Sequence, residues 1–413
     1  MNKCDCIIKN CKEIVTGKPM PVRGGSDMTL SVWRDMDIAI LDGYIIEIGS
    51  DLKYETASVI DGSQSVIIPG FIDSHTHLVF GGNRENEFLM RIRGDSYEAI
   101  AKAGGGIKNT VQHTREMSEN DLFLEAEKRL LRMFAYGTTT VEVKSGYGLD
   151  FETEIKMLAV VQKLQQKYPD TIIATFMGPH EIPQGYTEKS YIDFTIDTVL
   201  PAVKAQGVAV FADIFTEKGV FSLKETERYL RAAMDMGFKT KMHADELYPL
   251  GGAELGARLN ITSVDHLMKI TDKGMYALGE SDTIATLLPG TSFFLMMKEY
   301  APAKIILKNK AFVALASDFN PGSCHGLNMQ MIITLAALNL RMDIEEIFHA
   351  VGSNAAKAIG LDDRGAITVG KKADLLLLNI PNYKYLVYQF GENAVKTVIK
   401  NGSILVENNT CYT

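Results

Sequence analysis

The chain has 413 residues, of which 46% are hydrophobic and 23% are charged. This balance is typical of a globular protein with one or two domains and a large core, and it argues against a disordered chain. The formal net charge of −8 and the lack of a long Lys/Arg stripe argue against a nucleic-acid partner, because such a partner requires clustered cations that replace phosphate counterions. A small anionic substrate would need a dedicated cationic side chain.

The cysteines indicate a reducing compartment. There are five, an odd number without the Cys-x-x-Cys spacing of structural zinc sites: Cys4, Cys6, Cys11, Cys324 and Cys411. The first ten residues contain no apolar run of signal-peptide length, and no later run approaches the ~18 apolar residues of a membrane span. We therefore expect a cytoplasmic protein without a membrane partner.

The first 64 residues predict a small β unit. Residues 37–41 and 44–48 are rich in β-branched and apolar side chains, and the Asp42-Gly43 dipeptide between them favours the positive φ angles of a hairpin turn.

From about Gln64 the pattern changes to short apolar runs that alternate with longer amphipathic stretches. The amphipathic stretches carry helix signals, since Ser118 can cap a helix that stops at Gly137 and Ser222 can cap one that stops at Gly237. We predict eight strands, at residues 66–72, 138–144, 171–177, 208–215, 239–244, 262–266, 283–288 and 311–317. Eight βα units predict a (β/α)8 TIM-type barrel over residues 65–360.

The end of the chain returns to β character, at residues 365–379 and 395–399, after a last helical stretch at 333–359. Both ends of the chain are thus β-rich and flank the barrel. We predict that residues 1–64 and 361–413 form one small β-sandwich domain composed of both chain termini, which contacts between the two segments would test.

The active site of a (β/α)8 barrel lies at the carboxyl ends of its strands, so the polar residues at those ends are the candidates for chemistry. Five of the eight histidines fall there. The predicted strand ends carry His75, His77, Lys144, His180, His243, His266 and Asp318.

His75 and His77 suggest a metal site. They are separated by one residue, so on an extended segment both imidazoles leave the same face and can reach one ion. Alone, the pair is equally compatible with two hydrogen-bonded histidines at a strand end. The arrival of His243 and Asp318 from two further strand ends favours a metal site with these four ligands.

Three imidazoles and one carboxylate suit Zn²⁺ or Fe²⁺ and leave a position for water, whose pKa such an ion lowers towards ~7. Asp318 could accept the proton of that water and pass it to a leaving nitrogen. His266 could polarise or protonate the substrate, and the alternative for this residue is a packed core histidine.

Residues 208–215, the fourth predicted strand, contain no lysine that could be carboxylated to bridge two ions. We therefore predict one divalent ion per chain. Lys144, on the second strand, is interpreted as part of a structural ion pair.

Longer stretches resemble the amidohydrolase superfamily and, within it, the imidazolonepropionases, over nearly the whole chain. The superfamily resemblance rests on the later histidines, on Ser317-Asp318 and on Pro69-Gly70-Phe71-Ile72-Asp73-Ser74-His75-Thr76-His77. The narrower resemblance rests on Phe80-Gly81-Gly82-Asn83-Arg84, Ala103-Gly104-Gly105-Gly106-Ile107, Val143-Lys144-Ser145-Gly146-Tyr147-Gly148-Leu149, Gly178-Pro179-His180-Glu181, His243-Ala244-Asp245-Glu246 and Ser317-Asp318-Phe319-Asn320-Pro321-Gly322-Ser323.

The resemblance implies hydrolysis of the ring carbon–nitrogen bond of 4-imidazolone-5-propanoate to N-formimidoyl-glutamate, in histidine degradation, with zinc or iron as the ion and a homodimer as the assembly. It implies these substrate-binding residues: Arg84, Tyr147, His180, Glu246, Asn320, Gly322 and Ser323. The small-molecule substrate is anionic, which agrees with the need for a dedicated cation.

Several of these residues have alternative interpretations. Arg84 is a planar, always-charged fork that can bind the propionate, and the alternative is a salt bridge at a helix start. Tyr147 could instead pack a loop. Glu246 is expected to contact the imidazolone ring and carry a proton, together with His266 and Asp318 as catalytic groups, and the alternative is that it orients His243. The residues after Asp318 are expected to hold carboxylates.

The chain departs from the family pattern at Cys324-His325, where small residues or proline are expected, which leaves the details of this loop open; Cys324 is not expected to be a ligand, and this can be tested. His113 and His349 fall on predicted helices and receive no role. Two other functions remain open at this stage: a deaminase of the same superfamily acting on a neutral purine-like ring, which has no carboxylate for Arg84, and a non-catalytic barrel scaffold.

Overall fold

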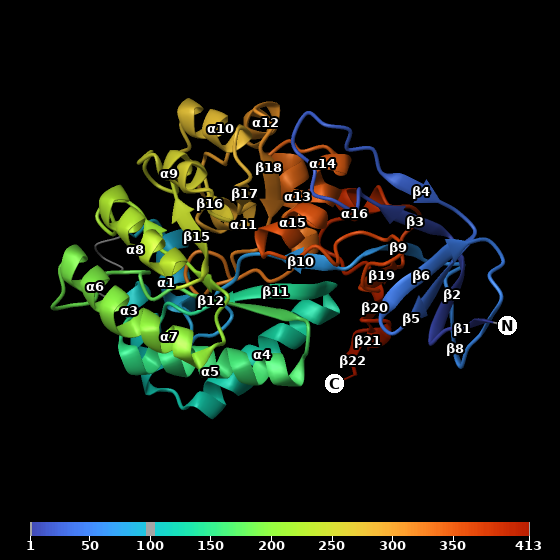
Figure 1. Ribbon diagram of the computed structural model, residues 1–413, viewed down its shortest axis with the longest axis horizontal. Coiled ribbons are helices and arrows are strands. Elements are labelled where there is room, and N and C mark those ends of the chain that lie inside the picture. Colours follow the sequence, from blue (N-terminus) through green and yellow to red (C-terminus); the bar gives the residue numbers. More distant parts are fainter. Residues whose placement is uncertain (1, 96–103, 413) are drawn as a thin grey trace.

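The structure is a computed structural model that describes residues 2–95 and 104–412. It contains a (β/α)8 barrel beside a β-sandwich built from both ends of the chain (Figure 1). Ala103, the first residue of one of the stretches quoted above, lies outside the described residues.

The barrel strands follow the chain order and pair in parallel, as predicted. Their bounds are β10 (Phe71–Asp73), β11 (Thr138–Lys144), β12 (Ile172–Phe176), β13 (Phe211–Ala212), β15 (Lys239–Ala244), β16 (Ser263–His266), β17 (Ile284–Leu287) and β18 (Phe312–Leu315). The fourth strand is interrupted, because Asp213 and Ile214 separate β13 from β14 (Phe215–Thr216), which also pairs with β15.

The barrel is closed by the segments that follow its first and last strands. The backbone N–H of Asp318 donates to the carbonyl of His75 at 3.0 Å, and the N–H of His77 donates to the carbonyl of Phe319 at 2.8 Å. These two bonds bring the end of β18 beside the residues that follow β10.

The helices cover the barrel, and the two predicted caps are confirmed. Ser118 accepts from the N–H of Asp121 at the start of α4, and Ser222 caps α8 in the same way; both helices end before a glycine with positive φ. Their bounds are α1 (Glu85–Ile92), α3 (Ile107–Glu116), α4 (Glu119–Ala135), α5 (Phe151–Lys167), α6 (Glu188–Phe194), the π-helix η1 (Thr195–Val199), α7 (Leu200–Gln206), α8 (Leu223–Asp235), α9 (Gly252–Leu259), α10 (Asp272–Gly279), α11 (Pro289–Phe294), α12 (Ala303–Lys308), α13 (Met329–Asn339), α14 (Ile344–Ala350) and α15 (Ser353–Ala358).

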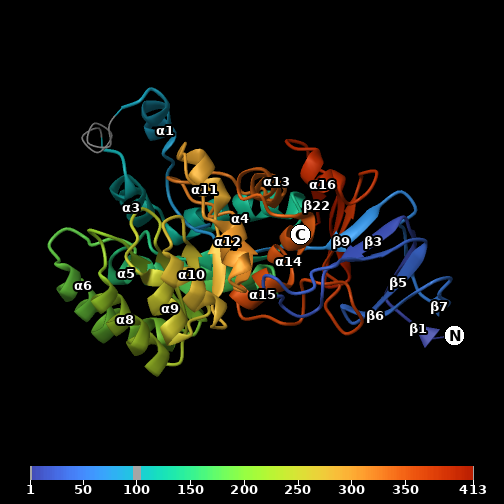
Figure 2. The same cartoon turned by 90° about the horizontal axis from the view of Figure 1, so that it is seen from above.

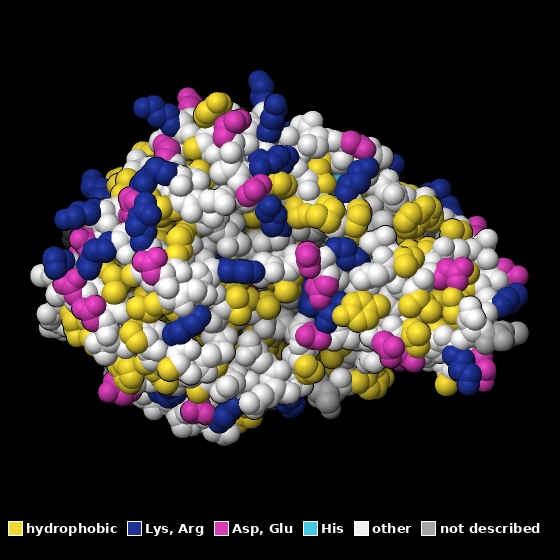
Figure 3. Space-filling model, viewed as in Figure 1, with side chains coloured by type: hydrophobic (Ala, Val, Ile, Leu, Met, Phe, Trp, Pro, Cys, Tyr) yellow, Lys and Arg dark blue, Asp and Glu magenta, His cyan; other side chains and the backbone are white. Residues whose placement is uncertain are grey.

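Seen from above, α1, α3 and α11 lie along one side of the barrel (Figure 2). Within the described residues, no helix is both long enough and apolar enough to cross a membrane. Acidic and basic side chains are interspersed over the face shown in Figure 3, in agreement with the lack of a basic stripe in the sequence.

Two sheets form the sandwich, and both chain ends contribute to it. One sheet has the order β22-β21-β20-β19-β9-β3-β4 and the other β6-β5-β2-β8, while β1 (Asn2–Lys3) pairs with β7 (Tyr54–Glu55). Their bounds are β2 (Cys6–Cys11), β3 (Glu13–Thr16), β4 (Ser31–Trp33), β5 (Met36–Leu41), β6 (Tyr44–Gly49), β8 (Ser58–Asp61), β9 (Val66–Pro69), β19 (Leu375–Leu378), β20 (Val395–Lys400), β21 (Ser403–Glu407) and β22 (Thr410–Cys411), with the short helix α16 (Tyr385–Tyr388) between β19 and β20.

The sandwich core joins residues that lie far apart in the sequence. Ile8 and Ile38 of one sheet pack in the same buried cluster as Leu375 and Ile399 of the other. The predicted hairpin is confirmed as β5 and β6, and Asp42 and Gly43 have φ angles of 52° and 78°. The exact domain boundaries predicted above stay predictions.

The prediction that residues 66–72 form a single barrel strand was wrong. It divides at Gly70 into β9, which pairs with β3 and β19 in the sandwich, and β10, which belongs to the barrel. The N–H of Gly70 donates to Asp374 in the sandwich domain, and the N–H of the next residue, Phe71, donates to Gly137 beside the barrel. The continuous apolar run is explained by burial in two different sheets.

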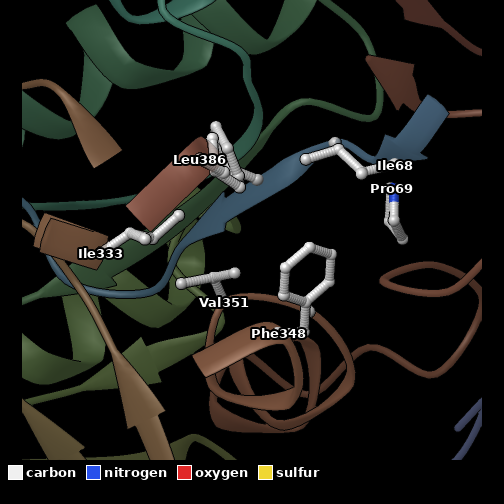
Figure 4. A pocket seen from close by; sticks show the side chains of 9 residues that line it. Ile68, Pro69, Ile333, Phe348, Val351 and Leu386 are labelled. Atoms are coloured by element: carbon white, nitrogen blue, oxygen red, sulfur yellow. The ribbon is translucent and has the colours of Figure 1, made fainter. Parts of the chain in front are cut away.

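Apolar side chains seal the junction between the two domains. Helices α13, α14 and α16 pack there against β9 and the start of β10. A cavity of only about 10 Å³ remains between these elements. Figure 4 shows Ile68 and Leu386 on one side of it and Phe348 and Val351 on the other. The junction is thus close-packed, so a small change in side-chain volume there should lower the stability of the fold.

Gly70→Ala tests the junction. A Cβ at this position would lie 2.2 Å from Thr139 Oγ1, so neighbouring side chains must shift, and we expect the free energy of unfolding to fall by about 1–3 kcal/mol. The measurement is urea denaturation followed by circular dichroism. Gly326→Ala is the matched control, because a Cβ there meets only Cys324 Sγ at 3.9 Å; equal loss in both variants would contradict the prediction.

Candidate active site

The predicted site residues lie together at the carboxyl ends of the barrel strands. A cavity of about 440 Å³ opens there, and every predicted metal, catalytic or substrate residue except His75 lines it. The lining residues among them are His77, Arg84, Tyr147, His180, His243, Glu246, His266, Asp318, Asn320, Gly322 and Ser323. His75 lies beneath them and is fully buried.

The four predicted ligands meet around His75. Its Nε2 lies 3.4 Å from Asp318 Oδ1, and His77 Nε2 lies 3.6 Å from the same oxygen. His243 Nε2 lies 3.4 Å from His77 Nε2. Among the described residues, two overlapping groups have ligand atoms within 4.8 Å of one another: His75, His77 and His243, and His75, His266 and Asp318.

The polar atoms of this group fit a cation. His75 Nε2 is buried and has no hydrogen-bond partner, which is costly unless something accepts its lone pair. Burial holds the pKa values of His75 and His77 well below the usual range, so both imidazoles are neutral, the form that binds metal ions. None of the cysteines, Cys324 included, belongs to either group of ligand atoms found among the described residues.

Buried carboxylates orient two of the histidines. His75 Nδ1 lies 2.6 Å from Asp265 Oδ2, and His243 Nδ1 lies 3.1 Å from Asp213 Oδ1. Since a carboxylate accepts, each Nδ1 carries the proton and each Nε2 keeps its lone pair for a ligand. His77 differs, because its Nδ1 is buried without a partner.

Lys144 is an ion-pair residue, as interpreted from the sequence. Its ammonium lies 2.7 Å from both Glu142 and Asp213, and all three side chains are fully buried. Burial lowers the pKa of Lys144, but Asp213 and Glu142 outweigh it and raise the pKa above its usual value.

Sequence reasoning missed the other charged residues beneath the site. Glu142, Asp213, Lys241 and Asp265 were not singled out, nor was Thr291, whose hydroxyl donates to Asp318 Oδ2 at 2.5 Å. The two-residue period of a strand could have indicated some of them, because Glu142 shares a face with Lys144 and Lys241 shares a face with His243.

The acidic groups at the site have shifted pKa values. Burial raises the pKa of Asp318 to about 6, although the Thr291 hydroxyl lowers it. Burial, with the negative charges of Asp318 and Glu217, raises the pKa of Glu246 to about 8. Such values near neutrality suit groups that take up and release protons.

The backbone is strained at two of these positions. Asp318 has a φ of 52° and His266 a φ of 81°, which residues other than glycine rarely adopt. Strain of this kind concentrates at active sites, where the surrounding structure holds it in place.

Comparison with known proteins agrees with this fold and this donor set. A sequence model of the amidohydrolase family matches residues 66–405. The chain belongs to the amidohydrolase family.

Curated relatives match this amidohydrolase over nearly its full length. Proteins named imidazolonepropionase are 44% identical in Parabacteroides distasonis, over 98% of this chain and 99% of the relative. In Bacillus velezensis the identity is 45%, over 97% of each chain, and in Staphylococcus aureus it is 42%, over 99% of each chain.

Solved structures share the fold. An adenosine deaminase from Xanthomonas campestris with bound zinc superposes with a TM-score of 0.74 at 16% identity, covering 100% of this chain and 95% of the other. A triazine hydrolase variant gives 0.75 at 16% identity, covering 98% and 95%. Together with the family match, the clustered donors identify a divalent metal site in this amidohydrolase.

Arg84 lies at the cavity wall and is partly engaged by a neighbour. Its Nε and Nη2 donate to the two oxygens of Glu87 at 2.8 and 2.6 Å, so the helix-start salt bridge considered above is present. Nη1 makes no hydrogen bond to the described residues. A Cβ on Gly322 would lie 2.0 Å from this Nη1, so only glycine admits the guanidinium here.

Tyr147 and His180 also line the cavity, where both rings lie beside His77. Glu154 of α5 accepts from the backbone N–H groups of Gly146 and Gly148, which holds the Tyr147 loop in place. His180 Nδ1 donates to the carbonyl of Gly146 at 3.1 Å, and burial lowers the pKa of His180 to about 3. His180 is therefore neutral, and its Nε2 is an acceptor.

Asn320 shapes the loop after β18. Its Oδ1 accepts from the N–H groups of Gly322 and Ser323, and its Nδ2 donates to the carbonyl of Asp318 and to Ser323 Oγ. These bonds occupy the whole side-chain amide, so a direct substrate contact would require their exchange. The substrate-binding role of the loop stays a prediction.

The remaining histidines and Cys324 belong to neither group of ligand atoms found among the described residues. His349 Nε2 accepts from the N–H of Lys18, and His113 lies on α3. His325 packs against Phe319 with ring centroids 5.1 Å apart. Burial raises the pKa of Cys324, which keeps it a neutral thiol and a poor ligand.

Removal of a ligand should abolish metal binding. We expect about one divalent ion per wild-type chain and less than about a tenth of an ion in His243→Ala, because a three-ligand remnant holds the ion weakly. Elemental analysis of the purified proteins measures this. His349→Ala, which alters a histidine outside the site, should keep the wild-type content, and a normal content in His243→Ala would rule out the predicted ligand set.

Proposed function

We propose that this amidohydrolase hydrolyses 4-imidazolone-5-propanoate to N-formimidoyl-L-glutamate, the activity implied by the names of its full-length relatives. The observation that carries the proposal is the pairing in one cavity of a histidine-rich metal site with Arg84, a cation suited to the propionate. It is a hydrolase reaction on a carbon–nitrogen bond of a cyclic amide.

The reaction needs one water molecule. The water oxygen bonds to the ring carbonyl carbon, the bond from this carbon to the ring nitrogen breaks, and the nitrogen leaves with a proton. The protein must therefore remove a proton from water and deliver one to nitrogen. When bound, the metal ion supplies positive charge that lowers the pKa of water and polarises the carbonyl.

Asp318 is suited to accept the proton of water. Its Oδ2 is held by Thr291, and its Oδ1 faces His75 and His77 at the site of the ion. The pKa of about 6 leaves the carboxyl deprotonated at neutral pH but basic enough to take a proton in the transition state.

His266 and Glu246 also line the cavity and lie beside each other. His266 Nδ1 lies 3.7 Å from Glu246 Oε1, and burial keeps the pKa of His266 well below its usual value, so it is a neutral hydrogen-bonding group. Glu246 is protonated below about pH 8 and can deliver a proton to the leaving nitrogen. We propose Glu246, His266 and Asp318 as the catalytic residues.

Different lining residues of the cavity hold the propionate and the ring of the substrate in this proposal. Arg84 offers Nη1 to the carboxylate, and Ser323 presents its hydroxyl on the loop that Asn320 holds. Tyr147 and the neutral His180 face the ring, with their own rings 5.2 Å apart. A deaminase acting on a neutral purine would leave Arg84 with Glu87 as its anionic partner and Nη1 without a substrate carboxylate to bind.

Three finer points are part of the proposal. The ion is Zn²⁺ or Fe²⁺, since three imidazoles and one carboxylate suit both. The assembly is a homodimer, by analogy with symmetric enzymes of this kind. The compartment is the cytoplasm, in agreement with five free cysteines in the structure.

Arg84→Met tests the substrate. Loss of the cation should raise KM by about 10²-fold or more with a smaller change in kcat, because the charge-assisted bond forms in both ground and transition states. The loss of imidazolonepropanoate is followed by ultraviolet absorbance. Arg84→Lys should recover part of the affinity, and a wild-type KM in Arg84→Met would refute a propionate-binding role.

Glu246→Gln tests the proton donor. In the wild type kcat should fall as pH rises through about 8, because the raised pKa keeps Glu246 protonated below this pH and not above it. The charge of a bound ion moves this limb to lower pH. The variant should lose about 10²–10⁴-fold in kcat and lose this alkaline limb. A pH–rate profile that keeps the limb in the variant would assign the donor elsewhere.

A further inference from the structure

A network of five buried charged residues lies beneath the metal site and outside the cavity. Its members are Glu142, Lys144, Asp213, Lys241 and Asp265, and each side chain is completely buried. None of them lines the cavity described above, so a substrate does not reach them. Buried charges are costly unless each is paired, which raises the question of what this network does.

One arm of the network ends at His243. Lys144 Nζ lies 2.7 Å from Asp213 Oδ2, and the other oxygen of Asp213 lies 3.1 Å from His243 Nδ1. The three residues come from β11, from the interruption between β13 and β14, and from β15. Lys144 thus holds the carboxylate of Asp213 in place, and Asp213 in turn orients the imidazole of His243.

A second arm repeats the pattern and ends at His75. Lys241 Nζ lies 3.7 Å from Asp265 Oδ2, and the same oxygen lies 2.6 Å from His75 Nδ1. Lys241 also donates to the carbonyl of Ser74, the residue before this ligand, at 2.7 Å. Two histidine ligands are therefore each backed by an aspartate and a lysine.

Glu142 joins the two arms. Its Oε1 lies 2.7 Å from Lys144 Nζ and 3.9 Å from Lys241 Nζ, and it accepts a short hydrogen bond from Thr175. Its Oε2 accepts from the backbone N–H of Thr76 at 3.2 Å, while its carbonyl accepts from the Thr76 hydroxyl at 2.6 Å. Thr76 is the residue between His75 and His77.

The network is net negative, since three carboxylates face two ammonium groups, and this sign suits a cation above it. A network whose only task was stability could have been replaced by apolar side chains at little cost. Here its terminal contacts are the Nδ1 atoms of two metal ligands, and such contacts fix the tautomer and direction of each imidazole.

We propose that Glu142 is a positioning residue for the metal ion. Through Lys144 and Asp213 it orients His243, through Lys241 and Asp265 it orients His75, and through Thr76 it fixes the segment between the two adjacent ligands. Its carboxylate therefore sets metal affinity without contacting the ion. The inference rests on the metal site and is independent of the substrate.

Glu142→Gln is the direct test, because it removes the charge and keeps the size. Zinc affinity is measured by competition with a chromophoric chelator, at a temperature where circular dichroism shows the variant folded. We expect the affinity to fall by about 10–100-fold, as for other changes behind a metal ligand. No substrate is present, so failure of the proposed function does not affect the result.

Glu13→Gln is the matched control. Glu13 is a buried glutamate in the sandwich that pairs with Arg34, so its change removes the same charge far from the barrel site. It should lower the midpoint of thermal unfolding and leave zinc affinity unchanged. Equal zinc affinities in wild type, Glu142→Gln and Glu13→Gln would overturn the proposal, and so would equal losses in both variants.

Thr175→Val keeps the proposal testable if Glu142→Gln does not fold. This change removes only the hydroxyl that donates to Glu142 Oε1 and preserves the shape of the side chain. We expect a several-fold loss of zinc affinity. Wild-type affinity in folded Thr175→Val, with Glu142→Gln unfolded, would also overturn the proposal.

Discussion

Two backbone hydrogen bonds join the open edges of the barrel, from Asp318 to His75 and from His77 to Phe319, and they are also the bonds that assemble the metal site. Barrel closure places the carboxylate of the last strand within reach of the two histidines that follow the first strand. The left-handed backbone of Asp318 is part of this arrangement, in which its Oδ1 lies near the Nε2 atoms of His75 and His77. The fold and the donor set therefore depend on the same contact.

Two layers of polar side chains lie on either side of these two hydrogen bonds. Above them, the cavity is lined by imidazoles, by a tyrosine and by the guanidinium groups of Arg84 and Arg91. Below them, lysines and carboxylates are buried without access to solvent. Burial acts differently on the two layers: it keeps His75 and His77 neutral and ready to bind a cation, whereas mutual pairing keeps Lys144 charged. The predicted metal ligands lie at the boundary between these environments.

Much of the fold and site could be predicted from the sequence, for identifiable reasons. The strands β11 and β15 were predicted at their observed bounds, because apolar runs between helix signals are strong indicators. His75, His77, His243 and Asp318 were found because strand ends in this fold converge on one point. Lys241 and Asp265 were missed because charged residues inside a strand are ordinarily taken as exposed. The division at Gly70 was missed because burial in two sheets gives the same apolar pattern as burial in one.

That division has a consequence for the order in which the chain can fold during synthesis. The strand β9 pairs with β3, made shortly before it, and with β19, which begins at residue 375. The N-terminal strands must therefore stay without their final neighbour while the whole barrel is translated. A chain whose synthesis stops before residue 375 leaves an edge of β9 unpaired, directly beside the segment that carries His75 and His77, and such an edge can pair with other chains.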